Sequence, residues 1–129
     1  MQQTGTGITQ VGRVIVPVSD QDRAIAFYTE ILGFEVRADI TMSPTYRWIE
    51  VAPASGVTSI AIVPPMEGKP VGVETGIGFE TPDIDADHAS LRARGVDVDE
   101  EVARMGDPVP PMFFFRDPDG NTLFITETA

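Results

Sequence analysis

Apolar and polar positions along the chain follow the same order twice. In each half, a run of β-branched or aromatic residues precedes an amphipathic segment with acids at its start and a glycine at its end, and three further strand-like runs follow. The two helices are expected within residues 19–33 and 82–95. Ala24 and Ala86 each stand nine residues before the closing glycine. Such a repeat predicts an α+β fold of two βαβββ modules.

Each expected strand is a short run rich in β-branched or aromatic residues. The runs span residues 13–18, 34–40, 46–52 and 58–64 in the first half, and 75–81, 96–102, 111–117 and 121–127 in the second. No long linker separates the halves, so they should pack as one unit. We therefore expect a flexible leader over 1–10 and a single domain over 11–129, with module one at about 11–65 and module two at about 73–127.

The segment RDPDGN, residues 116–121, contains two carboxylates that could be an acid–base pair or only part of a tight turn. Pro118 fixes φ at the second position of a type I turn, and Asp117 can accept backbone N–H bonds. Gly120 can adopt the left-handed conformation that closes a hairpin. Asp117 and Asp119 should then sit on a solvated hairpin tip. The sequence predicts a turn with no catalytic role.

Charge and composition argue against several classes of partner. The chain has 9 basic and 20 acidic residues, and its net charge of −11 disfavours binding to nucleic-acid phosphates. No apolar run is long enough for a membrane helix, and residues 1–10 lack the basic and apolar regions of a signal peptide. The chain has no cysteine, which favours a cytoplasmic location. We therefore expect neither a nucleic-acid nor a membrane partner.

The two βαβββ modules, the segment VSDQDRAIAFYTEILGFEV and the segment FFFRDPDGNTLFITE resemble the vicinal oxygen chelate superfamily, which includes glyoxalase I, extradiol dioxygenases and bleomycin-resistance proteins. The resemblance covers roughly residues 11–127. It implies a cup-shaped, mostly antiparallel sheet with helices on its outer face and the site inside the cup. It also implies a homodimer. It does not define the activity, because one scaffold carries many functions.

Enzymes of this superfamily hold a divalent metal with His and Glu side chains from four strands of the cup. The matching positions in this chain are Arg13, Ala61, Gly76 and Phe124. None of these residues can be a metal ligand, because Ala, Gly and Phe lack a side-chain donor atom and Arg stays cationic. The only histidine, His88, is expected to be a solvated helix residue. We predict no metal and no other cofactor.

Aromatic and apolar side chains take the place of metal ligands in the expected cup. By alternation along a strand, Tyr46 shares one face with Trp48, and Met112 shares one face with Phe114. We expect Trp48 and Phe124 to form the floor of the ligand site. The predicted ligand-binding residues are Arg13, Ile15, Tyr46, Trp48, Ala61, Gly76, Met112, Phe114 and Phe124.

Small and charged residues complete this picture of the cup. Ala61 and Gly76, on facing strands, should leave room for a cavity. An inward guanidinium needs a partner, so Arg13 is expected to meet Glu50, Glu80 or an anion of the ligand. Residues 64–72, with the sequence PPMEGKPVG, could form a mobile rim.

Two functions from different classes fit these residues. The first is a non-catalytic binder that sequesters a flat aromatic or conjugated compound such as an antibiotic, as metal-free drug-resistance members of the superfamily do. The second is a metal-independent isomerase, cyclase or lyase acting on a carbonyl substrate, with Glu50 or Glu80 as base and Arg13 steadying an oxyanion. A dimeric accessory domain with an empty cup is a third interpretation. We favour the binder and assign no catalytic residue, because no nucleophile has an adjacent base.

Overall fold

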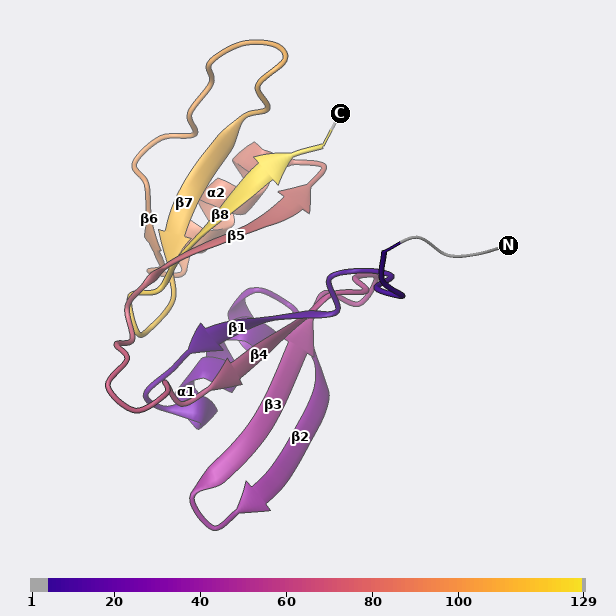
Figure 1. Ribbon diagram of the computed structural model, residues 1–129. Helices are drawn as coiled ribbons and strands as arrows, with labels where there is room; N and C mark the ends of the chain where they lie inside the picture. Colours follow the sequence, from indigo (N-terminus) through magenta and orange to yellow (C-terminus); the bar gives the residue numbers. More distant parts are fainter. Residues whose placement is uncertain (1–4, 129) are drawn as a thin grey trace.

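Each half of the chain forms a four-stranded sheet with a helical segment packed against it (Figure 1). The computed structural model describes residues 5–128. Module one contains β1 (Arg13–Pro17), α1 (Gln21–Ala26), the π-helical turn η1 (Phe27–Ile31), β2 (Glu35–Ser43), β3 (Tyr46–Ala52) and β4 (Ser59–Val63). Module two contains β5 (Glu74–Thr81), α2 (Ile84–Ala93), β6 (Asp97–Val98), β7 (Met112–Arg116) and β8 (Thr122–Glu127). These elements confirm the predicted α+β fold of two βαβββ modules.

The two sheets repeat one strand order. It is β1-β4-β3-β2 in module one and β5-β8-β7-β6 in module two. β1 runs parallel to β4, and β5 runs parallel to β8, whereas the other neighbouring strands are antiparallel. In Figure 1 the sheets approach each other near the β7–β8 turn and diverge towards the start of β1. Contacts between the modules are therefore expected at that turn.

Two strands end three or more residues away from the predicted position. β2 extends to Ser43 instead of ending at residue 40. The strand predicted over 96–102 is limited to β6, Asp97–Val98. The next residue explains the early end, because the Asp99 carboxylate accepts a hydrogen bond from the Phe114 backbone N–H at 3.0 Å. A side chain here replaces the main-chain acceptor that a longer strand would supply, so regular pairing stops.

Local sequence signals determine where both helices begin and end. Asp20 and Asp83 are the N-caps of α1 and α2, and each side chain accepts a hydrogen bond from the backbone N–H three residues on. Gly33 and Gly95 follow the helices with φ values of 77° and 79°, a conformation that glycine adopts at little cost. No helix in residues 5–128 has the length and apolar character needed to cross a membrane.

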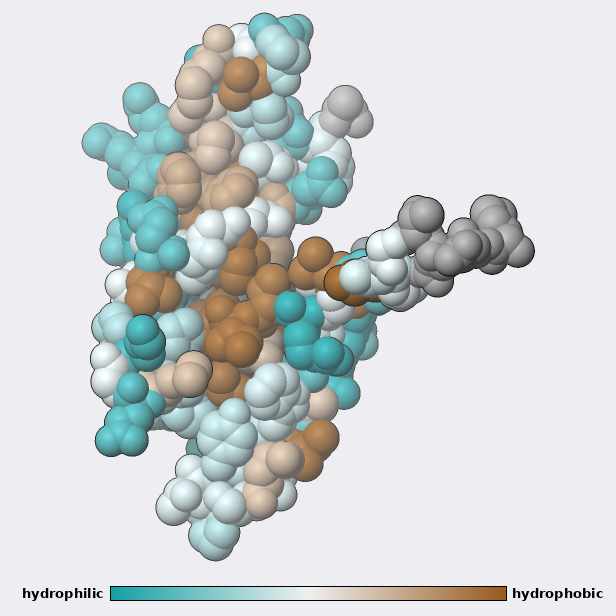
Figure 2. Space-filling model, viewed as in Figure 1, coloured by the Kyte–Doolittle hydropathy of each residue, from teal (hydrophilic) through white to brown (hydrophobic). Residues whose placement is uncertain are grey.

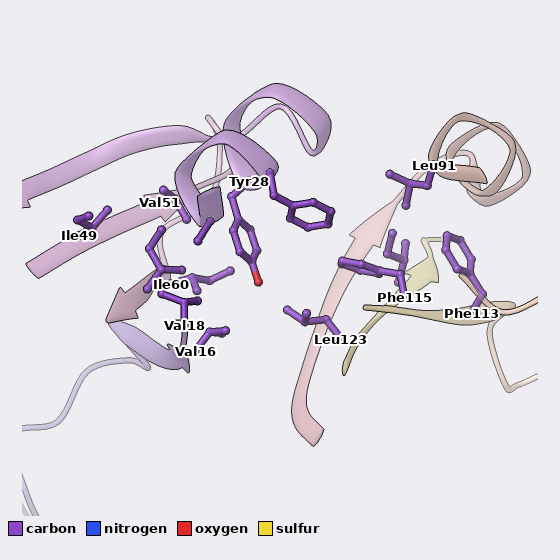
Figure 3. Packing of buried hydrophobic residues seen from close by; sticks show 14 of the residues in the cluster. Val16, Val18, Tyr28, Ile49, Val51, Ile60, Leu91, Phe113, Phe115 and Leu123 are labelled. Atoms are coloured by element: carbon purple, nitrogen blue, oxygen red, sulfur yellow. The ribbon is translucent and has the colours of Figure 1, made fainter. Parts of the chain in front are cut away.

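The helices and the inner sides of both sheets enclose one apolar core (Figure 3). Phe27 of η1 stacks on Phe115 of β7 with ring centroids 6.4 Å apart, and Tyr28 is fully buried in the same cluster. Burying such a side chain stabilises the folded state by about 1.5–3 kcal/mol relative to leaving it exposed. Since the core takes side chains from both modules, each module covers part of the other.

The β7–β8 turn docks onto module one instead of lying in solvent as the sequence analysis expected. The turn itself is confirmed, because the Gly120 N–H donates to the Asp117 carbonyl at 2.8 Å and Gly120 has a φ of 83°. Asp117 is only 5% exposed, and its carboxylate accepts hydrogen bonds from the Tyr28 hydroxyl at 3.0 Å and the Asn121 side-chain amide at 2.9 Å. Asn121 also donates to the Pro17 carbonyl at 2.7 Å. Turn rules describe only local residues, so they did not reveal these partners.

Asp119 connects the same turn to the start of α1. Its carboxylate accepts hydrogen bonds from the Ser19 backbone N–H at 3.1 Å, from the Ser19 hydroxyl and from Arg23 at 3.2 Å, and only 4% of its side chain is exposed. Burial, with the nearby Asp117 and Asp119 carboxylates, raises the pKa of the Tyr28 hydroxyl above its ordinary value. Tyr28 therefore stays a neutral donor, and the two aspartates join the modules.

We predict that Tyr28→Phe destabilises the fold and that Tyr46→Phe does not. Loss of the Tyr28 hydroxyl leaves a buried carboxylate with one donor fewer, which should lower the free energy of unfolding by about 1–3 kcal/mol. The Tyr46 hydroxyl has no hydrogen-bond partner within residues 5–128, so its removal should change this free energy by less than about 0.5 kcal/mol. Urea unfolding followed by circular dichroism measures both. Equal stability of the two variants would contradict the role given to the Tyr28–Asp117 bond.

Candidate ligand-binding site

Each sheet has one face turned away from its helix, and the predicted site residues lie on these two open faces (Figure 1). In module one, Ile15 pairs with Ala61 across β1 and β4, and Ala61 pairs with Glu50 on β3, so the three side chains share a face. Trp48 and Tyr46 follow on the same face of β3 by alternation. Ile15 is 58% exposed there, whereas Ala61 is fully buried.

A cavity of about 560 Å³ opens between the open face of module one and the segment that links the modules, residues 64–73. Small-molecule pockets typically enclose about 300–1,000 Å³, so its size suits a ligand. Figure 2 shows apolar residues gathered on this part of the surface, over β1 and β4. No acidic side chain of the described residues lines this cavity. Its main walls are Ile15, Tyr46 and Trp48 from the sheet, and Pro65, Met66 and Lys69 from the linking segment.

Glu50 holds two of the predicted site residues in place near this cavity. Its Oε2 accepts hydrogen bonds from the Trp48 indole N–H at 2.7 Å and from Arg13 Nε at 3.2 Å, which confirms Glu50 as a partner of Arg13. The bond from Trp48 holds the pKa of Glu50 below its ordinary value, Arg13 and Ser59 act in the same direction, and burial opposes them. Glu50 is therefore a weakly basic anion that orients the indole ring.

The predicted residues of module two form a second cluster. Phe114 and Phe124 pair across β7 and β8 with ring centroids 5.5 Å apart, and Met112 lies on the same face of β7. Phe124 pairs with Gly78 on β5, whereas Gly76 lies in an irregular stretch of that strand with a φ of 72°. A Cβ at position 78 would overlap the Phe124 ring. The Phe124 ring thus fills the space beside β5 where a cavity was expected. Gly78, which contacts this ring, was not among the predicted site residues.

Within one chain, the structure does not bring all nine predicted residues around one cavity. The lining of the cavity beside Trp48 includes no residue of β5, β6, β7 or β8. Phe124, expected to share its floor, lies on the other sheet. Glu80, the second candidate base, lines two cavities between the modules and does not line the one beside Trp48.

The linking segment is the part of the site that strand periodicity could not assign. The expected rim, residues 64–72, forms one wall of the cavity. The Lys69 N–H donates to the Met66 carbonyl at 2.8 Å, and Gly68 in this turn has a φ of 78°. Pro65 and Pro70 restrict the backbone on both sides of the turn. A short turn between prolines is the sequence signal for such a wall.

His88 and Glu127 of module two make structural contacts. His88 is packed, contrary to expectation: its Nε2 lies 2.7 Å from the Asp99 carbonyl oxygen, and its ring meets the Phe113 ring edge-on at 4.8 Å. The Glu127 carboxylate accepts a hydrogen bond from the Ile84 N–H at the start of α2. Within residues 5–128, no group of three or more His, Cys, Asp or Glu side chains is arranged to hold a metal ion. That the protein binds no metal stays a prediction.

Comparison with known proteins agrees with this fold. Residues 10–125 match the family model of the Glyoxalase/Bleomycin resistance protein/Dioxygenase superfamily. The chain belongs to this superfamily. Two solved structures and one sequence relative illustrate the likeness.

TnmS3, an antibiotic binding protein from Streptomyces sp. CB03234, is 36% identical with a TM-score of 0.83, over 97% of this chain and 100% of that chain. A superfamily member from Sphaerobacter thermophilus DSM 20745 is 34% identical with a TM-score of 0.86, over 94% and 98% of the two chains. YetH of Bacillus subtilis (strain 168) is 36% identical over 122 residues, which cover 93% of this chain and 99% of YetH.

We predict that Gly78→Ala destabilises the protein because of Phe124. The new methyl group would overlap the ring, and such overpacking should lower the free energy of unfolding by about 1–3 kcal/mol. In a Phe124→Ala background the same change should cost less. Gly12→Ala is the matched control, since nothing lies within 4 Å of a Cβ at position 12. Urea unfolding of these proteins gives the coupling free energy between positions 78 and 124. Strictly additive effects of the two substitutions would show that the Phe124 ring does not contact Gly78.

Proposed function

We propose that this protein is a metal-independent superfamily member that binds and sequesters a flat aromatic or conjugated compound, such as an antibiotic. The observation that carries the proposal is the mainly apolar cavity of about 560 Å³ beside Trp48. Stacking on an aromatic ring contributes about 0.5–1.5 kcal/mol beyond the burial of apolar area. The likeness to the antibiotic binding protein TnmS3 supports a ligand of this class.

The fixed position of the Trp48 ring favours a role in ligand binding. Because its indole N–H already bonds to Glu50 at 2.7 Å, the ring needs no further ordering when a ligand stacks on it. Groups that are ordered before binding lose less conformational entropy on binding. The same bond argues against Glu50 as the base of an isomerase, cyclase or lyase, because a carboxylate with a lowered pKa and two donors is a poor proton acceptor.

We also propose that the protein is a cytoplasmic homodimer with two equivalent clefts. Ile15, Ile40 and Met42 are 58%, 52% and 62% exposed, and Ile40 pairs with Trp48 on the open face of module one. A gathering of exposed apolar side chains is typical of an interaction surface, and twofold pairing is the commonest way to cover it. A second copy that sets its module two against this face would bring its Phe124 to the cavity beside Trp48.

Ligand binding is predicted to change the fluorescence of Trp48, the only tryptophan. The titration uses polycyclic and glycopeptide antibiotics alongside simple 2-oxo compounds, with product analysis of each mixture. Trp48→Ala should weaken binding about fivefold or more, from the loss of roughly 1 kcal/mol of stacking, whereas Trp48→Phe should retain part of the affinity. Because these variants lack the fluorescent Trp48, their affinities are measured by calorimetry. Protein treated with EDTA should bind equally well.

Three results would contradict parts of this proposal. Turnover of any compound would replace the binder with an enzyme. One nickel, zinc, iron or manganese ion per chain in elemental analysis would contradict metal independence. Unchanged affinity in Trp48→Ala, with the fold intact by circular dichroism, would show that the ring is only part of the packing.

The proposed dimer is predicted to give a dimer mass in light scattering at micromolar concentration. Trp48→Ala and Phe124→Ala homodimers should each bind ligand weakly. If each cleft combines Trp48 of one copy with Phe124 of the other, a mixed dimer refolded from both variants has one cleft with both rings. Binding should then reappear, reported by the remaining Trp48. A monomer mass, or mixed dimers that bind no better than either variant, would contradict the shared cleft.

A further inference from the structure

Lys69 differs from every other basic residue of the chain. It is the only lysine among nine basic residues. Each of the eight arginines donates to a carboxylate, a hydroxyl or a backbone carbonyl of the protein. These arginines are Arg13, Arg23, Arg37, Arg47, Arg92, Arg94, Arg104 and Arg116. The Lys69 ammonium has no hydrogen bond or ion pair to any of the described residues 5–128.

The place of Lys69 makes this lone cation relevant to the site. Lys69 lines the cavity beside Trp48, although its side chain is exposed overall. Its backbone is held by the turn to the Met66 carbonyl and by Pro70, which follows it. The ammonium is therefore attached to an ordered backbone at the border of an apolar cavity. A cation placed in this way is available to a ligand.

A second donor without a protein partner lines the same cavity. The Tyr46 hydroxyl has no hydrogen-bond partner within the described part of the chain, and Tyr46 is half-buried on β3. No described carboxylate lines the cavity, and the nearby Glu50 is already bonded to Arg13 and Trp48. The polar side-chain groups of the lining that have no partner among the described residues are thus an ammonium and a hydroxyl, which together suit a negatively charged acceptor.

We propose that the site selects flat ligands that carry an anionic oxygen, a carboxylate or a phenolate, which Lys69 and Tyr46 bind at the edge of the ring system. This inference rests on the proposed function, because it names the chemical class of the same ligand. The net charge of −11 would favour cationic ligands at long range. Salt screens such interactions beyond about 8 Å at physiological ionic strength, so the groups that line the cavity decide the selectivity.

The test compares three pyrene probes that differ only in their polar group: 1-pyrenecarboxylate, 1-pyrenemethanol and 1-pyrenemethylammonium. Wild-type protein should bind the carboxylate most tightly and the ammonium most weakly. In Lys69→Met, affinity for the carboxylate should fall on the order of fivefold, the upper range for a partly exposed ion pair, while affinity for the alcohol stays unchanged. Lys69→Arg should keep most of the carboxylate affinity, and Tyr46→Phe should lose a smaller part of it.

Arg104→Met is the matched control. It removes the same charge from a residue that pairs with Asp85 of α2, and Arg104 does not line the cavity. Its carboxylate affinity should stay within about twofold of wild type, because the pair is exposed and distant charges are screened. An equal loss in Arg104→Met and Lys69→Met would reduce the effect to net charge and overturn the inference.

A chemical readout tests the contact independently of affinity. Acetylation of Lys69 by an N-hydroxysuccinimide ester, followed by mass spectrometry, should slow when 1-pyrenecarboxylate is bound, and 1-pyrenemethanol should protect less. The α-amino group of the chain is the internal reference. Equal protection by both probes would contradict a direct bond between the ammonium and the carboxylate.

The outcomes separate this inference from the proposed function. If 1-pyrenemethanol binds and changes Trp48 fluorescence but the carboxylate gains nothing from Lys69, the proposed function stands and the anion selectivity is wrong. If none of the three probes binds, both are wrong. A wild-type preference for the ammonium probe would also overturn the inference, because it would show that the acidic surface governs the site.

Discussion

The buried carboxylate of Asp117 is the constraint on which the arrangement of the molecule depends. It is 5% exposed and accepts four hydrogen bonds, from the Tyr28 hydroxyl, the Asn121 side chain, and the backbone N–H groups of Asp119 and Asn121. A buried charge is tolerated only when it is well hydrogen-bonded. Three of these donors lie in the β7–β8 turn and the fourth on η1 of the other module, so the charge is fully satisfied only when the modules are docked.

The same cluster also shapes the cavity. The Asn121 side-chain oxygen accepts hydrogen bonds from the backbone N–H groups of Gly72 and Val73, both at 2.9 Å. These residues end the linking segment, whose other end continues from β4. The segment is thus anchored at both ends, and the prolines within it limit its freedom. The wall that carries Lys69 therefore depends on a turn whose residues do not line the cavity. A site of this kind is ordered by module docking as well as by its own contacts.

Periodicity and capping signals predicted the helices, most strand positions and the face on which Trp48 lies, because each of these depends on neighbours in the sequence. The same rules failed where a distant residue decides the outcome. Asp117 is buried because Tyr28 lies opposite it, β6 ends early because Asp99 reaches β7, and His88 is packed against Phe113. No local pattern contains that information.

In the candidate site, too, sequence rules succeeded where neighbouring residues decide the outcome and failed elsewhere. Alternation assigned Tyr46 to the same face as Trp48, and both residues line the cavity, as does the predicted site residue Ile15. The position carried over as Gly76 was displaced by the irregularity in β5, which puts Gly78 opposite Phe124. An irregularity in a strand changes which side chain faces the site, and alternation cannot be followed through it. Lys69 was outside strand reasoning altogether, because a loop residue has no periodicity.

The predicted absence of metal ligands bears on what the open face would recognise. Arg13, at the first of the four positions that the superfamily resemblance matches to metal ligands, is paired with Glu50. Glu50 in turn holds the indole of Trp48, so charges that are paired within the protein produce an ordered apolar surface. Paired charges of this kind contribute little selectivity to a ligand, because their hydrogen-bonding capacity is already used. For the proposed ligand, selectivity would then depend on the groups without protein partners and affinity on the Trp48 ring. The two properties could therefore change separately within one cavity.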